Sequence, residues 1–336
     1  MKIKNIALLF SASLFVLSAC RGAKAPELRV GVSIPTQREE RWVRDVQKLE
    51  AEAKTAKIDL KVQISDNDST KQISQCENLF AQGIDVLIIA PHDAAAASVI
   101  VEKAHGYGIK VISYDRLIVN ADVDLYISFD NVKVGELQGA YLAKAAPRGR
   151  YVLLSGAPTD NNAALFKKGA MNILKPLIDS GAIKVVMEQA VKDWQPIEAM
   201  KLMENALTAN KNKIDAVLAP NDGTAGGCIQ AMAVQNLAGK IPVTGQDAEL
   251  SAVRRIIDGS QSMTVFKDTR ELASAAIAAA VKLHAKADPG VNSKVNNGKI
   301  DVPSILLVPI SVDKANLDKT LIESGYIKKE ELSSAK

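Results

Sequence analysis

The sequence predicts an α/β protein built from two doubly wound domains, each with a parallel sheet covered by helices on both faces. After residue 28, short apolar segments alternate with segments of helical periodicity. This alternation is typical of parallel sheets. It restarts near residue 132, and a repeated set of such units in one chain indicates two domains of this kind.

Composition agrees with this prediction. The chain has 336 residues, of which 47% are hydrophobic and 24% are charged, and these values are ordinary for a soluble protein of two domains. The formal net charge is +4 and the charges are spread along the chain. We therefore expect no nucleic-acid partner.

The amino-terminal residues predict export. Lys2 and Lys4 precede an apolar run over 6–16, and Leu17-Ser18-Ala19-Cys20 follows. This is the order of a secretory signal, so we assign 1–19 to a signal peptide and 20–27 to a tether. The four residues 17–20 resemble a bacterial lipobox. This resemblance implies cleavage before Cys20, lipidation of that residue, and a protein anchored to a cell membrane and facing the periplasm or the exterior.

Two alternatives apply to this segment. A simple signal peptide with an incidental cysteine would give an exported protein without a lipid. A membrane-spanning anchor is disfavoured, because the apolar run is shorter than the roughly 20 residues that cross a bilayer.

The first series of elements follows from apolar runs and helical periodicity. In the helix over 40–55, Trp42, Val46 and Leu49 fall on one side, and the helix over 69–82 ends before Gly83. The strand over 85–90 is a continuous apolar run. The complete first series consists of strands over 28–34, 60–64, 85–90, 110–114 and 126–129 and helices over 40–55, 69–82 and 94–106.

The second series repeats the pattern from residue 132. We expect helices over 132–146, 162–180, 196–209, 224–237 and 251–258, and strands over 151–156, 183–186, 214–219, 242–245 and 263–266. An alanine-rich helix over 272–287, a polar loop over 288–302 and a last strand over 304–310 complete the chain. We assign 28–131 plus 268–300 to the first domain and 132–267 plus 301–336 to the second.

Polar residues come directly after several of these strands. Ligands of such sheets bind beyond the carboxyl ends of the strands, where the sequence has Asp115-Arg116, Asn221 and Asp247. An aspartate beside an arginine offers acceptors and donors in fixed geometry, as vicinal hydroxyls require. A structural ion pair is the alternative for that pair. Asp222 is expected to cap the following helix, and Asn221 to face the ligand.

Both tryptophans lie in polar segments. Trp194 opens a helix where an indole is poorly placed for a core, so we expect it to stack on the apolar face of a sugar ring, with edge packing as the alternative. Arg41-Trp42 lies just past the first strand, and a solvated helix start is the alternative there. Lys267 follows the strand over 263–266, where the chain would cross back to the first domain.

Neither a metal nor a cofactor is expected. No two of the three histidines have ligand spacing with each other or with a cysteine, and no acidic calcium loop is visible. After Cys20, Cys76 and Cys228 remain. A disulfide is one reading in an exported protein, and two buried thiols are the reading that we favour.

An enzyme is disfavoured by the absence of motifs. No Gly-x-Gly-x-x-Gly follows the first strand, and the sequence contains neither a Walker Gly-Lys-Ser/Thr nor a Gly-x-Ser-x-Gly elbow. A DNA-binding repressor is disfavoured as well, because it would need an element such as an amino-terminal helix-turn-helix, and this chain has the predicted signal peptide there.

The order and spacing of several segments carry a resemblance that covers essentially the whole chain after residue 28. The chain resembles the periplasmic sugar-binding proteins of the ribose/galactose type, and among them most closely the D-xylose-binding proteins of ABC transporters. The segments are 40–42, 114–116, 126–131, 134–138, 160–163, 203–210, 221–222, 224–227, 245–248 and 301–304.

This resemblance implies a type I periplasmic binding protein, in which two domains joined by a three-segment hinge close over one sugar. Trp194 and Trp42 would flank the pyranose ring. The implied hydroxyl-binding residues are Asp115, Arg116, Asn221 and Asp247, joined by Arg41, Asn162 and Lys267. The implied partners are an ABC permease and a monosaccharide, for which D-xylose is the first candidate. We expect the protein to be a monomer.

Two departures bear on the choice of sugar. Residues 34–37, Ile-Pro-Thr-Gln, lack the acidic residues that xylose-binding relatives tend to carry there, which leaves the sugar open. Residues 162–166 contain no arginine, which disfavours ribose and galactose. The alternatives to D-xylose as the ligand are another sugar or a furanose signal molecule. The alternative to a transport role alone is a sensory role with a chemoreceptor or sensor kinase.

Overall fold

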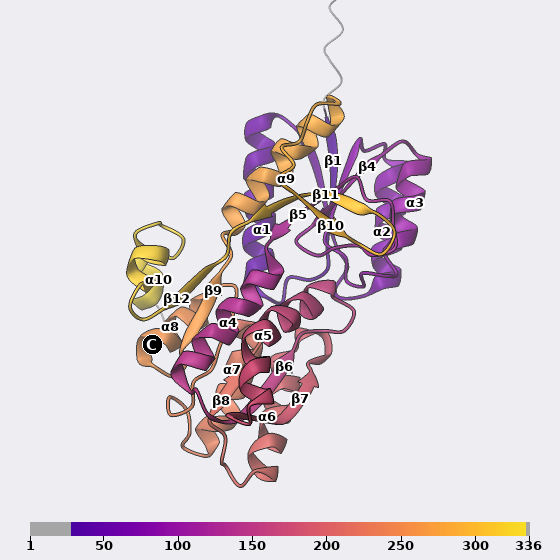
Figure 1. Cartoon of the computed structure of the whole chain (residues 1–336). Coiled ribbons are helices and arrows are strands. Elements are labelled where there is room, and N and C mark those ends of the chain that lie inside the picture. Colours follow the sequence, from indigo (N-terminus) through magenta and orange to yellow (C-terminus); the bar gives the residue numbers. More distant parts are fainter. Residues whose placement is uncertain (1–27, 334–336) are drawn as a thin grey trace, which may run out of the picture.

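The structure is a computed structural model that describes residues 28–333 and has two α/β domains, one above the other in Figure 1. The signal peptide, the tether and Cys20 lie outside these residues. Within the described chain, no helix is long and apolar enough to cross a membrane.

The first domain is a seven-stranded sheet in the order β10-β11-β5-β4-β3-β1-β2. All neighbours pair in parallel except β10, which is antiparallel to β11. Its strands are β1 (Arg29–Ile34), β2 (Asp59–Ile64), β3 (Val86–Ile89), β4 (Lys110–Tyr114), β5 (Leu125–Phe129), β10 (Ser293–Asn296) and β11 (Asp301–Leu307). Its helices are α1 (Glu40–Ala56), α2 (Ser69–Ala81), α3 (Ser98–Gly106) and α9 (Thr269–His284).

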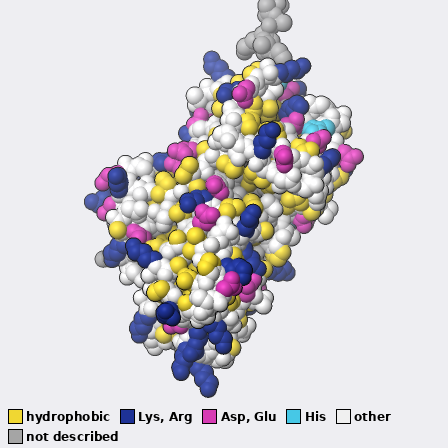
Figure 2. Space-filling view, viewed as in Figure 1, with side chains coloured by type: hydrophobic (Ala, Val, Ile, Leu, Met, Phe, Trp, Pro, Cys, Tyr) yellow, Lys and Arg dark blue, Asp and Glu magenta, His cyan; other side chains and the backbone are white. Residues whose placement is uncertain are grey.

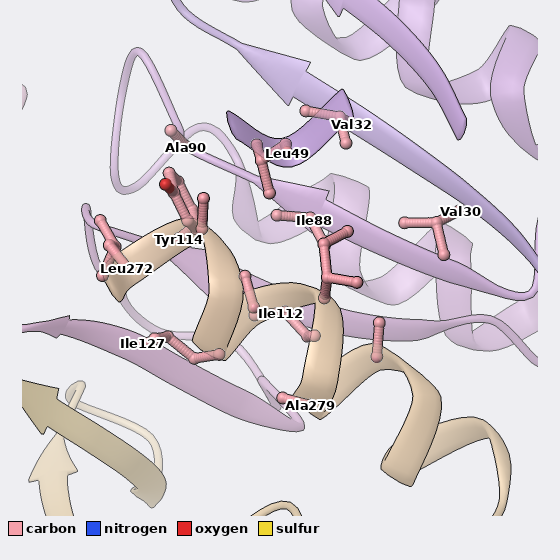
Figure 3. Close-up of a cluster of buried hydrophobic side chains, with 14 of the residues drawn as sticks. Val30, Val32, Leu49, Ile88, Ala90, Ile112, Tyr114, Ile127, Leu272 and Ala279 are labelled. Carbon is pink, nitrogen blue, oxygen red and sulfur yellow. The ribbon is translucent and has the colours of Figure 1, made fainter. Parts of the chain in front are cut away.

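The two faces of this sheet bury separate cores, because alternate residues of a strand point to opposite faces. Val30 and Ile88 pack against Leu49 of α1 and Ala279 of α9, as Figure 3 shows. Residues such as Leu87 face α2 and α3 on the other side. The central strand β3 is buried on both faces and is therefore a continuous apolar run, as the sequence predicted.

The second domain has a β7-β6-β8 sheet and a β12-β9 pair. Helices α4 and α5 cover one face of the three-stranded sheet and α6 and α7 the other. The strands are β6 (Gly149–Ser155), β7 (Ile183–Ala190), β8 (Ala216–Leu218), β9 (Met263–Phe266) and β12 (Ile310–Asp313). The helices are α4 (Asn131–Ala145), α5 (Asn161–Asp179), a 3₁₀ turn (Lys192–Trp194), α6 (Pro196–Ala209), α7 (Asp222–Val234), α8 (Leu250–Asp258), a π turn (Asp318–Ile322) and α10 (Lys329–Ser333).

The strand predicted over 242–245 does not form as such. Val243 makes one isolated parallel bridge to Val217, and Pro242 has no N–H to donate to a ladder. The Thr244 hydroxyl substitutes for backbone pairing, since it donates to the Ala219 carbonyl and accepts from the Ala219 N–H. The extended segment thus links β8 to β9 without being a regular strand.

The carboxyl-terminal boundary of the domains was also predicted wrongly. β11 pairs with β5, with Ser304 opposite Tyr126, so residues 301–307 belong to the first domain. The expected loop over 288–302 contains β10, and the expected last strand over 304–310 is divided between β11 and β12. The third crossing between the domains therefore falls between Leu307 and Ile310, beside the crossings at Asp130–Asn131 and Lys267–Asp268.

Surface charges of both signs are interspersed over most of the face shown in Figure 2, and Lys and Arg gather at the end of the second domain farthest from the first. Cys76 and Cys228 are buried free thiols. Burial raises the pKa of each to about 12, so both behave as small apolar side chains.

Helices α4 and α5 approach closely because both have glycines at the contact. A Cβ on Gly169 would lie 1.9 Å from the Val132 carbonyl oxygen. We predict that Gly169→Ala lowers the thermal midpoint, with a loss of about 1–3 kcal/mol or more from overpacking. Gly106→Ala in α3 is the matched control, since its Cβ would meet nothing within 4 Å. Equal midpoints for the two variants in thermal unfolding would contradict this account.

Candidate ligand-binding site

A hollow of about 320 Å³ lies between the two domains and is lined by the residues that the sequence singled out. All nine candidates line it: Arg41, Trp42, Asp115, Arg116, Asn162, Trp194, Asn221, Asp247 and Lys267. None of them is more than 6% exposed. The alternative of a solvated helix start at Arg41-Trp42 is therefore wrong, since both side chains are buried.

Arg41 is held by two carboxylates of its own domain. Its Nη1 donates to Asp115 Oδ2 at 2.7 Å, and its Nη2 donates to Asp45 Oδ2 at 2.9 Å. Asp45 is one turn further along α1 and also accepts a hydrogen bond from the Tyr114 hydroxyl. Burial opposes the charge of Arg41, but the Asp115 and Asp45 carboxylates raise its pKa well above the ordinary value. The guanidinium is thus fixed and charged.

Asp115 has a left-handed backbone, with φ 59°, which an L-residue adopts at a cost and which is frequent at functional sites. Its carbonyl oxygen accepts hydrogen bonds from the Tyr126 hydroxyl, the Ser128 hydroxyl and Asn162 Nδ2. These bonds turn the Asp115 carboxylate toward Arg41 and the hollow. Burial raises the pKa of Asp115, but the Arg41 and Lys267 cations outweigh it and lower the pKa to about 2.

Arg116 does not pair with Asp115, so the alternative of a structural ion pair between these neighbours is wrong. Arg116 Nε lies 2.9 Å from Asp160 Oδ2, across the gap between the domains. The guanidinium carbon also lies 5.3 Å from the centre of the Trp42 ring, within cation–π range. Arg116 therefore joins both walls of the hollow.

Lys267 lies at a domain crossing and faces both domains. Its Nζ is 3.1 Å from Asp247 Oδ1 and 3.6 Å from Asp115 Oδ2. Arg41 Nη1 lies 3.9 Å from Asp247 Oδ1 as well. Asp247, like Asp115, has a positive φ, at 96°. Two cations and two carboxylates thus share the hinge side of the hollow.

Trp194 is fixed by its backbone and its neighbours. Asp193 and Trp194 both have positive φ, at 49° and 57°. A Cβ on Gly156 would lie 2.0 Å from the indole ring, so glycine there lets the indole pack against the end of the strand. Phe166 meets it edge-to-face at 6.3 Å between centroids. Trp194 Nε1 is buried and donates to no group among the described residues.

Asn221, and not Asp222, is the cap of α7. Its Oδ1 accepts from the Thr224 N–H at 3.0 Å, which leaves the Asn221 amide nitrogen for the hollow. Asp222 instead accepts from Gln261, Thr264 and the Glu249 N–H. Burial raises the pKa of Asp222 to about 7. The prediction of roles for this pair was thus wrong for Asp222, while Asn221 does face the hollow.

The sequence reasoning missed four lining residues: Glu39, Asp160, Phe166 and Gln246. Asp160 lies in the loop between β6 and α5, and Gln246 directly follows the extended segment 242–245, so their position after strand-like segments could have identified them. Phe166 is one turn into α5 and looked like an ordinary core residue. Glu39 supplies an acidic group just past the segment 34–37, which lacks one.

The site has the chemistry of a polyol-binding pocket without metal ligands. Among residues 28–333, no group of histidine, cysteine, aspartate and glutamate side chains could hold a metal ion. Indole and phenyl rings offer apolar faces, and charged groups on both domains offer donors and acceptors. A small ring with several hydroxyls matches that combination.

Comparison with known proteins agrees with this geometry. Residues 30–288 match the family described as periplasmic binding protein domain. The chain belongs to the periplasmic binding protein family. It is 48% identical over 332 residues to the D-xylose-binding periplasmic protein of Escherichia coli (strain K12), covering 99% of this chain and 100% of that protein.

Two further family members are informative. The multiple sugar-binding periplasmic receptor ChvE of Rhizobium radiobacter is 40% identical, over 90% of this chain and 92% of its own. A carbohydrate transporter solute-binding protein from Chloroflexus aurantiacus, solved in complex with D-glucose, is 38% identical with a TM-score of 0.85 and covers 91% of this chain and 98% of its own. The family consists of binding proteins, so this chain is a binding protein and not an enzyme.

We predict that Asp115→Asn destabilises the protein by about 3–5 kcal/mol near neutral pH, because it leaves two buried cations short of a partner. Since the pKa of Asp115 is lowered to about 2, its carboxylate stabilises the fold above the unfolded pKa of about 3.9. That contribution is lost as the pH falls toward 2. The difference in thermal midpoint between wild type and variant should therefore shrink below about pH 4. A difference that stays constant from pH 6 to pH 3 would contradict the assignment.

Proposed function

We propose that this protein captures a monosaccharide between its two domains and delivers it to an ABC sugar permease. D-xylose is the first candidate for that sugar. One observation carries the proposal: two indoles and at least four charged side chains, all of them buried, converge on a single hollow between the domains. The 48% identity to a D-xylose-binding protein supports the choice of sugar.

Selectivity follows from the burial of these charges. Buried ions are expensive unless each is paired and hydrogen-bonded. A sugar whose hydroxyls match Asp115, Arg116, Asn221 and Asp247 completes their hydrogen bonds, and one inverted hydroxyl leaves a group unsatisfied. Such an error costs about 1–3 kcal/mol, or about tenfold in affinity for each stereocentre.

Tight binding of so small a ligand is energetically feasible. A pentose has about ten non-hydrogen atoms, and the ceiling near −1.5 kcal/mol per atom allows about −15 kcal/mol. Micromolar affinity needs only about −8 kcal/mol. The margin covers the free energy of ordering both domains around the sugar.

Domain closure supplies the mechanism. Three chain crossings permit a hinge motion, and contacts across the gap favour the closed arrangement. They include Arg116 with Asp160, Arg38 Nη2 donating to the Asp193 carbonyl at 2.5 Å, and Glu40 Oε2 accepting from the Leu250 N–H at 2.9 Å. A sugar that bridges both walls adds to these contacts in the closed form alone, and so shifts the equilibrium toward it.

Other ligands of the same site are the alternative. The relatives include receptors named for several sugars and a structure solved with D-glucose, so another pentose or a hexose is the main competitor. A furanose signal molecule, or presentation of the closed form to a chemoreceptor or sensor kinase, would use the same residues.

The deciding experiment is calorimetric titration of the protein from Arg21 onward with xylose, ribose, arabinose, glucose and galactose. The protein is unfolded and refolded first to remove sugar carried through purification. We expect one-to-one binding of xylose, with ribose and galactose at least tenfold weaker. Heat with another of the five sugars but not with xylose would reassign the ligand, and no heat with any would refute the proposal for these sugars.

We predict that Trp194→Ala weakens xylose binding at least tenfold, because it removes a stacking face from the hollow. Trp194→Phe should recover part of that loss. Tyr107→Ala is a control with an aromatic side chain that is 67% exposed on the first domain. Calorimetry in which Trp194→Ala binds as wild type would exclude stacking in favour of edge packing.

We also propose that Cys20 is lipidated and anchors the protein, on the strength of the lipobox-like residues 17–20. Cys20→Ser should release the protein from the membrane fraction and remove the mass of the lipid from the mature chain. Cys76→Ser is the control and should leave both unchanged. A wild-type chain without added lipid mass would favour a simple signal peptide.

Size-exclusion chromatography of the same samples tests the expected monomeric state.

A further inference from the structure

The two strand ends that present Asn221 and Asp247 are bridged by one buried side chain from a neighbouring helix. Gln138 lies in the middle of α4 and is completely buried. Its Nε2 lies 3.0 Å from the Gly245 carbonyl oxygen, 3.2 Å from that of Pro220 and 3.5 Å from that of Ala219. One amide group thus holds carbonyls just past β8 and just past the extended segment at Val243.

The orientation of this amide is determined by its surroundings. Three carbonyl oxygens face Nε2, and an oxygen placed there would be repelled by all three, so the assignment of donor and acceptor atoms is unambiguous. Gln138 Oε1 is buried without a hydrogen-bond partner among the described residues. An unsatisfied buried acceptor costs about 1–3 kcal/mol, which offsets part of what the Nε2 hydrogen bonds contribute.

The same two strand ends are otherwise joined by few bonds. The Asp222 N–H donates to the Gln246 carbonyl at 3.0 Å, and Gln246 Nε2 donates to the Pro220 carbonyl at 3.4 Å. Regular pairing stops one step earlier, because Val243 makes only an isolated bridge. Beyond that bridge, the spacing between the two strand ends depends on one backbone bond, on the Thr244 hydroxyl bonds to Ala219, and on the amide contacts of Gln138 and Gln246. No continuous sheet ladder fixes it.

We propose that Gln138 is a positioning residue for the ligand site: its amide fixes the distance between the strand ends of Asn221 and Asp247. This inference rests on the proposed function, since it explains how the second domain matches a particular arrangement of hydroxyls. Gln138 does not line the hollow, so it acts through the two residues that do.

The test compares two substitutions at this position. Gln138→Met keeps the approximate shape of the side chain and removes its N–H donor. At every pH it should weaken xylose binding at least tenfold and reduce the ratio of affinities between xylose and its epimers. In Gln138→Glu, an ionised carboxylate faces the three carbonyl oxygens at pH 8 and is repelled by them. At pH 5 the carboxyl group is protonated and its O–H can donate to one of these carbonyls. Its affinity relative to wild type at the same pH should therefore recover about tenfold or more between pH 8 and pH 5, while the ratio for Gln138→Met stays flat.

Gln75→Met is the matched control. Gln75 Nε2 also donates to a carbonyl at a strand end, that of Ile64 at 3.0 Å, and its Oε1 is likewise buried and unpartnered. No residue of β2 lines the hollow, so this variant should bind xylose within twofold of wild type.

Two results would overturn the inference while the proposed function stands: Gln138→Met binding as tightly as wild type, or a Gln138→Glu affinity whose ratio to wild type does not change with pH. If wild type binds no sugar, the proposed function fails and the inference is judged by hydrogen exchange. The Asp222 and Asp247 amides should then exchange faster in Gln138→Met than in wild type, and equal rates would refute the role of Gln138.

Discussion

The mutual neutralisation of buried charges determines how the centre of this molecule is arranged. Arg41 and Lys267 lie among the carboxylates of Asp115, Asp247 and Asp45, all nearly inaccessible to water. Each of these groups would be costly to bury alone, and each becomes tolerable through the others. Because the carboxylates come from both domains, the network also determines how the domains meet.

Backbone strain accompanies this network. Asp115, Trp194 and Asp247 all have left-handed backbone conformations, and each lines the hollow. Such conformations persist only where surrounding contacts over-determine them. For Asp115 the contacts are three hydrogen bonds to its carbonyl, and for Trp194 they include the packing on Gly156. The hollow is therefore formed by rigid strand ends, which suits a site that must distinguish rings differing in one hydroxyl.

The sequence predicted the architecture and the candidate site well, because both follow from one rule: polar residues after apolar parallel strands meet at a common edge. The same rule, applied without exception, would have added Asp160 and Gln246. It could not identify Gln138 or Asp45, whose roles depend on which helix packs behind which strand end.

The sequence-based predictions that were wrong also have physical explanations. Pro242 cannot donate to a ladder, so an apolar, strand-like segment forms one bridge only. Asn221 took the capping role expected of Asp222, because its own side chain reaches the Thr224 N–H. The carboxyl-terminal boundary depended on a pairing between residues about 180 positions apart, which local patterns do not report.

That long-range pairing has a consequence for how the chain acquires its fold. The first domain is complete only when β11 joins β5, with Ser304 opposite Tyr126, whereas most of the second domain is one uninterrupted stretch of chain. Contacts between distant residues form slowly, because a long loop must close before they stabilise anything. During synthesis, β1 to β5 are therefore made long before β11, the strand that completes their sheet. Until β11 arrives, β5 is the edge of the sheet, and its unpaired N–H and C=O groups are open to pairing with another chain.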